Sequence, residues 1–134
     1  MPVTQSAFGS LDAAMEAMIQ AKRTLTTGAT GNHTLTVGEF INGVYTVPDG
    51  GSAANIQTPT AAAIVAAIKD CAVGTEFSFI LYNLDAGDSM TLTAGSGVTV
   101  EGTVTAVATK ARRFDCVVTN ITAASEAVLV LTTA

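Results

Sequence analysis

Apolar and small polar residues alternate along much of the second half of the chain, over residues 75–134. Gly, Asn and Asp separate the alternating runs, and few charged residues lie within them. Alternation with a period of two is typical of strands that bury one face, and the separating residues are those that favour turns. The pattern therefore predicts about five or six strands in this region.

One of these strands carries apolar residues on both faces. Phe77, Phe79 and Leu81 share one face, while Ile80 and Tyr82 occupy the other. Such a strand is either central in its own fold, with the second face covered by the same chain, or it lies in a contact between subunits. Both interpretations stay open for Ile80 and Tyr82.

The last strand is also apolar on both faces. We expect Leu129 and Leu131 to point inward and Val128 and Val130 to point outward. A terminal strand that exposes valines and has no Lys or Pro is unusual in a free monomer, because its edge can pair with another chain. Four residues are thus the candidates for self-association, and the alternative that all four belong to the core of their own fold stays open: Ile80, Tyr82, Val128 and Val130.

Two turns are predicted as the tips of β-hairpins. Asn42-Gly43 lies between apolar runs at residues 35–41 and 44–47, and this dipeptide supplies the two positive φ values of a type I′ turn. Gly95-Ser96-Gly97 lies between two alternating runs and is predicted as a hairpin loop. With the first hairpin the chain has about seven or eight strands, which suits a sandwich of two sheets.

An Ala-rich helix is predicted over about residues 59–71, with Thr58 as its N-cap and Pro59 at its first position. We expect this helix to pack across one open end or face of the sheets. The predicted fold class is therefore mainly β. It is a jelly-roll-like β-sandwich with one Ala-rich helix, forming a single domain over residues 34–134.

Residues 1–33 are predicted to form an N-terminal arm that contains an amphipathic helix over about residues 11–22. Residues 24–34 are rich in Thr, Gly and Asn and are expected to act as a hinge. The helix packs either on its own domain or on a neighbouring molecule. Spacings of three and four place its candidate neighbour contacts on one stripe: Leu11, Met15, Met18 and Ile19.

Charge is scarce in this chain. Of its 134 residues 13% are charged, against about 25% in an average soluble domain. Neutral polar residues or another protein must therefore cover much of the surface. The net charge of −5 and the scattered basic residues argue against nucleic acid as a partner. No apolar run reaches the length of about 20 residues that spans a membrane, and no secretory signal is predicted.

The chain offers little material for a catalytic or metal site. His33 is the single histidine and is expected to be an ordinary loop residue. Asp85 and Asp88 lack the further oxygen ligands of a calcium loop and are expected to form a turn. Cys71 and Cys116 are expected to be free thiols. No catalytic residue, cofactor or metal ion is predicted, and the protein is expected not to be an enzyme.

Two segments resemble structural proteins of tailed-bacteriophage virions. Residues 58–68, TPTAAAIVAAI, followed by residues 73–79, VGTEFSF, are similar to one motif of these proteins. Residues 92–100, LTAGSGVTV, are similar to a second motif. The resemblance covers residues 58–131 and includes capsid decoration or cement proteins and fibre-associated modules.

The resemblance implies a protein that works by assembly and not by catalysis. Its implied role is to decorate or cement the capsid shell by binding the major capsid protein and further copies of itself, as a trimer or a dimer. Its implied location is the capsid surface of the virion, after synthesis in the cytoplasm of the host bacterium. Leu11, Met15, Met18 and Ile19 are then the candidate contacts with the capsid or a neighbouring copy.

Two other hypotheses stay open. A fibre, neck or adhesin-type module would recognise glycan or protein on the host cell, although aromatic residues for sugar stacking make up only 5% of the chain. A small hydrolase would need His33 as its base, and substitution of His33 would then abolish activity.

Overall fold

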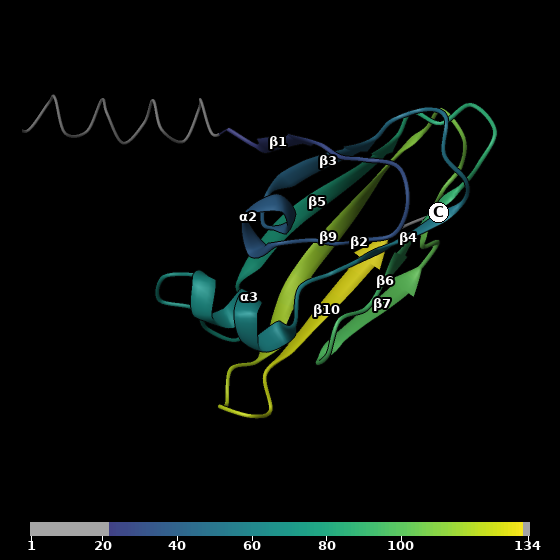
Figure 1. Cartoon of the computed structure of the whole chain (residues 1–134). Coiled ribbons are helices and arrows are strands. Elements are labelled where there is room, and N and C mark those ends of the chain that lie inside the picture. The colour runs from purple at the N-terminus through teal and green to yellow at the C-terminus, as the bar shows by residue number, and fades with distance from the viewer. Residues whose placement is uncertain (1–21, 133–134) are drawn as a thin grey trace, which may run out of the picture.

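The computed structural model describes residues 22–132, which form ten strands in two sheets and two short helices (Figure 1). The six-stranded sheet contains, in spatial order, β1 (Thr24–Thr27), β3 (Gly43–Val47), β5 (Glu76–Asn83), β9 (Ala111–Asn120), β10 (Ala127–Thr132) and β7 (Val98–Gly102). The four-stranded sheet contains β2 (His33–Thr34), β4 (Ala54–Gln57), β6 (Met90–Thr93) and β8 (Thr105–Ala106). The helices are α2 (Val37–Phe40) and α3 (Ala61–Ala67).

The chain crosses from one sheet to the other after almost every strand. β1, β3 and β5 are parallel neighbours in the six-stranded sheet, and β2, β4 and β6 are parallel neighbours in the four-stranded sheet. Parallel neighbours need a crossover connection. Here each crossover passes through the opposite sheet, and α2 and α3 lie in the segments that return the chain to the six-stranded sheet. Among the described strands, β9 and β10 are the only consecutive pair that hydrogen bond to each other.

The predicted mainly β fold with two sheets is confirmed. The jelly roll in particular is not confirmed, because jelly rolls are built from antiparallel strands. Of the eight strand pairings in the described residues, five are parallel: β1 with β3, β3 with β5, β2 with β4, β4 with β6, and β7 with β10. The stretch expected as a hinge, residues 24–34, instead contains β1 and β2 and so belongs to both sheets.

The core lies between the two sheets, and strand alternation supplies its side chains. Phe79 is fully buried, and its ring centroid lies 5.1 Å from that of Phe40 on α2 and 6.3 Å from that of Phe114 on β9. The other large buried side chains come from both sheets and from α3: Tyr45, Val47, Ile56, Ile64, Leu81, Met90, Leu92, Val118 and Val128. Within residues 22–132 no helix has the length and hydropathy needed to cross a membrane.

The predicted hairpin over residues 35–47 is wrong. The first half of that run forms helix α2, which begins with a capping box: the Thr36 hydroxyl accepts a hydrogen bond from the Glu39 amide, and the Glu39 carboxylate accepts one from the Thr36 amide. Asn42 does have a positive φ of 52°, but Gly43 already belongs to β3. The capping-box spacing overrides the turn signal of Asn42-Gly43.

The predicted Ala-rich helix is present as α3, but it is shorter than residues 59–71 and has a different cap. The Thr60 hydroxyl, not that of Thr58, accepts a hydrogen bond from a helix amide, that of Ala63 at 3.2 Å. Thr58 is buried, and its hydroxyl accepts a hydrogen bond of 2.8 Å from the Gly95 amide. A Cβ on Gly95 would lie 2.6 Å from the Thr58 and Pro59 carbonyl oxygens, so glycine is required where this loop meets the helix.

The loop at Gly95-Ser96-Gly97 is not a hairpin. It carries the chain from β6 in the four-stranded sheet to β7 in the six-stranded sheet, where β7 pairs with β10. β10 is therefore not an edge strand, because β9 covers one side of it and β7 the other.

Candidate interaction surface

The outer face of the six-stranded sheet carries an uncovered apolar patch, and Ile80 and Tyr82 lie in it. Strand register aligns Leu25, Val44 and Ile80 in one row across β1, β3 and β5. Side chains that are neighbours across strands share one face of the sheet. The outer patch consists of Leu25, Val44, Ile80, Tyr82, Val117, Leu129 and Leu131, of which Leu25 is 70%, Leu131 41% and Tyr82 38% exposed.

The predicted orientation of β10 is wrong by one residue. Val128 and Val130 are buried in the core, with exposed fractions of 1% and 0%, whereas Leu129 and Leu131 lie on the outer face. Val128 and Val130 thus offer no surface for self-association, and Leu129 and Leu131 take their place. The stripe residues Leu11, Met15, Met18 and Ile19 lie outside the described residues.

A hollow of about 450 Å³ lies at one end of the outer patch, over β5, β9 and β10. Its lining mixes apolar side chains, among them Val117 and Leu131, with charged ones. Arg113 donates to the Asp115 carboxylate at 3.3 Å, and both side chains are more than half exposed. Such an exposed pair contributes at most about 1 kcal/mol to stability. Arg113 and Asp115 are therefore held only weakly to each other, and each can bind a ligand group of the opposite charge.

Arg23 connects the start of the described chain to this hollow. Its guanidinium donates to the hydroxyl and to the carbonyl oxygen of Ser78, which lines the hollow on β5. Arg23 directly precedes β1, so its side chain extends past β3 to reach β5. The Arg23 side chain therefore lies at the edge of the hollow.

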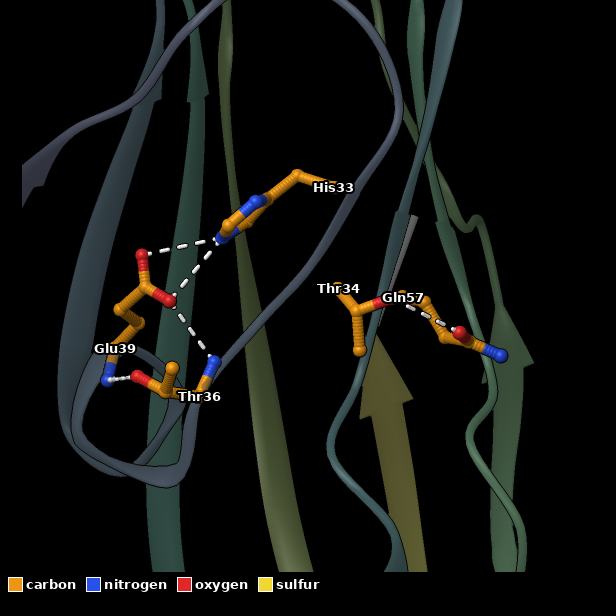
Figure 2. Close-up of polar contacts among 5 residues, drawn as sticks. All are labelled: His33, Thr34, Thr36, Glu39 and Gln57. Atoms are coloured by element: carbon orange, nitrogen blue, oxygen red, sulfur yellow. Dashed lines mark hydrogen bonds and ion pairs between the residues drawn. The ribbon is translucent and has the colours of Figure 1, made fainter.

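The outer face of the four-stranded sheet is polar and uncharged. Register aligns Thr34, Gln57 and Thr93 in one row and Asn55 and Thr91 in a second. The Thr34 hydroxyl donates to the Gln57 side-chain oxygen at 3.2 Å, as Figure 2 shows. A shallower hollow of about 320 Å³ opens among these residues. The two sheets therefore present surfaces of different chemistry.

His33 has a structural position between the sheets. It lies on β2, yet its ring stacks on Tyr45 of the six-stranded sheet, with centroids 5.0 Å apart and planes 7° apart. Its Nε2 atom lies 3.1 Å from the Glu39 carboxylate (Figure 2). Burial alone would raise the pKa of Glu39, but the Thr36 amide and His33 outweigh this effect and lower it. His33 thus links β2, α2 and β3, and it lies on a strand and not in a loop, with its side chain 37% exposed.

Asp85 is held as an anion inside the turn between β5 and β6. Its carboxylate accepts hydrogen bonds from the amides of Gly87 at 2.8 Å and Asp88 at 2.7 Å, and from that of Gly51 at 3.3 Å. The Gly87 and Asp88 bonds lower the pKa of Asp85 more than its burial raises it. Both carboxylate oxygens are therefore engaged by backbone groups, as expected for a turn residue.

Replacing Asp85 with asparagine should lower the melting temperature by roughly 5 °C or more at pH 7. The pKa of Asp85 in the folded state lies below the unfolded value of about 3.9. The ionised carboxylate therefore stabilises the fold fully above about pH 3.9, and this contribution is lost as the pH falls through the folded-state pKa. The deficit of the variant should accordingly shrink in melts recorded at pH 3. Asp88→Asn is the matched control, since only the backbone of Asp88 joins these bonds. An equal loss at both pH values would contradict this assignment.

The cysteines are free thiols, as predicted. Burial, with a smaller effect of the Asp115 charge, raises the pKa of the Cys116 thiol to about 12, so it stays protonated and unreactive at neutral pH. No group of three or more His, Cys, Asp or Glu side chains within residues 22–132 is placed to hold a metal ion.

Sequence reasoning missed most of the outer patch. Val117 could have been found, because it falls in the same alternation phase as Arg113 and Asp115 on the predicted strand. Leu25 and Val44 could not, since their row exists only through parallel pairing of β1, β3 and β5.

Comparisons of the chain with protein-family models, curated proteins and solved structures find no match.

Proposed function

We propose that the protein is a non-enzymatic structural component of a tailed-phage virion. It decorates or cements the capsid shell by binding the major capsid protein and further copies of itself. The proposal combines the resemblance of residues 58–131 to phage virion proteins with one structural observation. That observation is the outer patch, an apolar sheet face that the described residues leave exposed.

The outer patch favours protein as the partner. Its apolar rows can be buried without removing many ions from water, which would cost several kcal/mol for each unpaired charge. The Arg113–Asp115 pair lies on β9, between Ile80 of β5 and Leu131 of β10, and it brings one charge of each sign into such an interface. The proposal needs such a face and does not depend on a jelly-roll topology.

Shell binding tests this function. The purified protein should co-sediment with undecorated shells of the phage that encodes it and should raise the temperature at which the shells disrupt. Tyr82→Asp, within the outer patch, should weaken shell binding by at least about tenfold. Val107→Asp is the matched control, because Val107 is similarly exposed, at 48%, and lies outside the patch. Protein that leaves the shells unbound and unstabilised would refute the proposal.

A host-recognition module of a fibre, neck or adhesin is the alternative, and the polar hollow on the four-stranded sheet favours it. Asn32, Asn55 and Gln57 surround that hollow with neutral amides, which can hydrogen bond to sugar hydroxyls. Glycan-array binding that Gln57→Ala abolishes, without shell binding, would support this alternative.

A further inference from the structure

We infer that residues 11–22 of one copy dock in the hollow on the six-stranded sheet of a second copy, so that copies exchange their N-terminal segments. This inference rests on the proposed function, since it specifies how the protein binds copies of itself. It joins the two sets of candidate contacts, the apolar stripe and the outer patch, into one interface.

The hollow and the segment match in size and chemistry. Twelve helical residues extend about 18 Å, and the hollow reaches from Asn42, directly before β3, to Leu131 on β10, a span of three strand spacings or about 14 Å. The stripe would cover Val117 and Leu131 with Met15, Met18 and their apolar neighbours. The hollow presents charges of both signs, on Arg113, Asp115 and Glu76, and the segment also carries both.

The position of Arg23 argues that the partner is a second copy. The predicted helix extends to about residue 22, which leaves Arg23 alone between it and β1, and the Arg23 side chain already contacts Ser78 of its own hollow. To cover that same hollow, the segment would have to turn sharply at Lys22 and Arg23 and run sideways across the sheet face, because Arg23 is level with Ser78 and the rest of the hollow lies over β5, β9 and β10. Residues 11–23 contain no Gly or Pro for so tight a turn. A segment that makes no such turn can instead reach the hollow of a neighbouring copy.

Complementation between two full-length variants tests this exchange. Met15→Asp places a charge on the stripe and leaves the hollow intact, whereas Leu131→Asp places a charge in the hollow and leaves the stripe intact. Each substitution should raise the dissociation constant of the oligomer by at least about 100-fold, because a carboxylate would be buried without a partner. Each variant alone should run as a 13.5 kDa monomer in light scattering, whereas the wild type and Val107→Asp should run as oligomers.

An equimolar mixture of the two variants should form a complex with one copy of each, because one intact stripe then meets one intact hollow. A monomeric wild type, a variant that stays oligomeric, or a mixture that stays monomeric would overturn the inference. Circular dichroism melts check folding, and Leu131→Ser replaces Leu131→Asp if the latter fails to fold. Shell binding measured on the same samples separates the two proposals: a monomeric wild type that still binds shells would refute the exchange and leave the proposed function standing.

Discussion

Replacing Gly43 with alanine is expected to lower the free energy of unfolding by at least about 3 kcal/mol. A Cβ at this position would lie 1.8 Å from the carbonyl oxygen of Glu39 and 2.7 Å from its carbonyl carbon. Both atoms belong to the backbone of α2, so no side-chain rotation can make room. The added methyl group must push α2 away from the start of β3.

The displacement would reach the centre of the fold. Glu39 contributes to the capping box and to the contact with His33, and Phe40 packs on Phe79 in the core. Moving α2 therefore disturbs packing between the sheets as well as the helix itself. A protein with a total stability of about 5–15 kcal/mol would lose a large part of it.

Gly38→Ala provides the matched control for this substitution. Gly38 lies in α2 itself, and the nearest atom to a Cβ there is the Thr36 hydroxyl at 4.0 Å. Alanine should be neutral or should stabilise by up to about 1 kcal/mol, because glycine is the poorer helix former. Urea unfolding of both variants gives the comparison. If the Gly43→Ala variant were as stable as Gly38→Ala, the close approach of α2 to β3 would be disproved.

The local sequence around Gly43 contained two competing signals. Asn42-Gly43 is a strong predictor of a hairpin, and Thr36-Val37-Gly38-Glu39 has the spacing of a capping box. Which signal prevails depends on tertiary packing, because Leu35, the first residue of the predicted hairpin, donates its amide to the carbonyl oxygen of Gln57 on β4 in the other sheet. The sequence predicted the mainly β character, the two sheets and the site of α3, all of which follow from local periodicity and helix signals.

The pairing of strands could not be predicted in the same way. Alternation indicates which residues share a face of one strand, but it does not indicate which strands are neighbours. Predicting hairpins assumes that consecutive strands pair, and in this fold the chain usually crosses to the other sheet. The outer patch depends on those long-range pairings. Its central residues, Ile80 and Tyr82, were found only because β5 is apolar on both faces.

The sequence of β10 alone does not indicate which of its side chains point into the core. Residues 128–131 read Val-Leu-Val-Leu, so both faces are equally apolar and a shift of one residue leaves the pattern unchanged. Pairing with β9 decides the question. Val130 is the partner of Cys116 on the core face, and Leu131 is the partner of Asp115 on the outer face.

Substitution by aspartate should therefore affect folding very differently at the neighbouring residues Val130 and Leu131. Val130→Asp would bury a carboxylate among apolar side chains, because Val130 is fully buried and lies between Cys116 and Val100 in register. The cost is roughly 5 kcal/mol or more, which should leave the chain largely unfolded. Leu131→Asp should fold, with a melting temperature within a few degrees of the wild type, because its side chain is 41% exposed.

Thermal melts followed by circular dichroism distinguish the two variants, and self-association gives a second readout. Leu131→Asp should retain the cooperative transition while losing the oligomer, whereas Val130→Asp should show no cooperative transition. The reverse pattern, with a folded Val130→Asp and an unfolded Leu131→Asp, would place β10 one residue out of register. That shift would turn Leu129 and Leu131 into the core, and the hollow would lose the apolar side chain that β10 contributes to it. The same measurement therefore tests both the fold and the proposed interface.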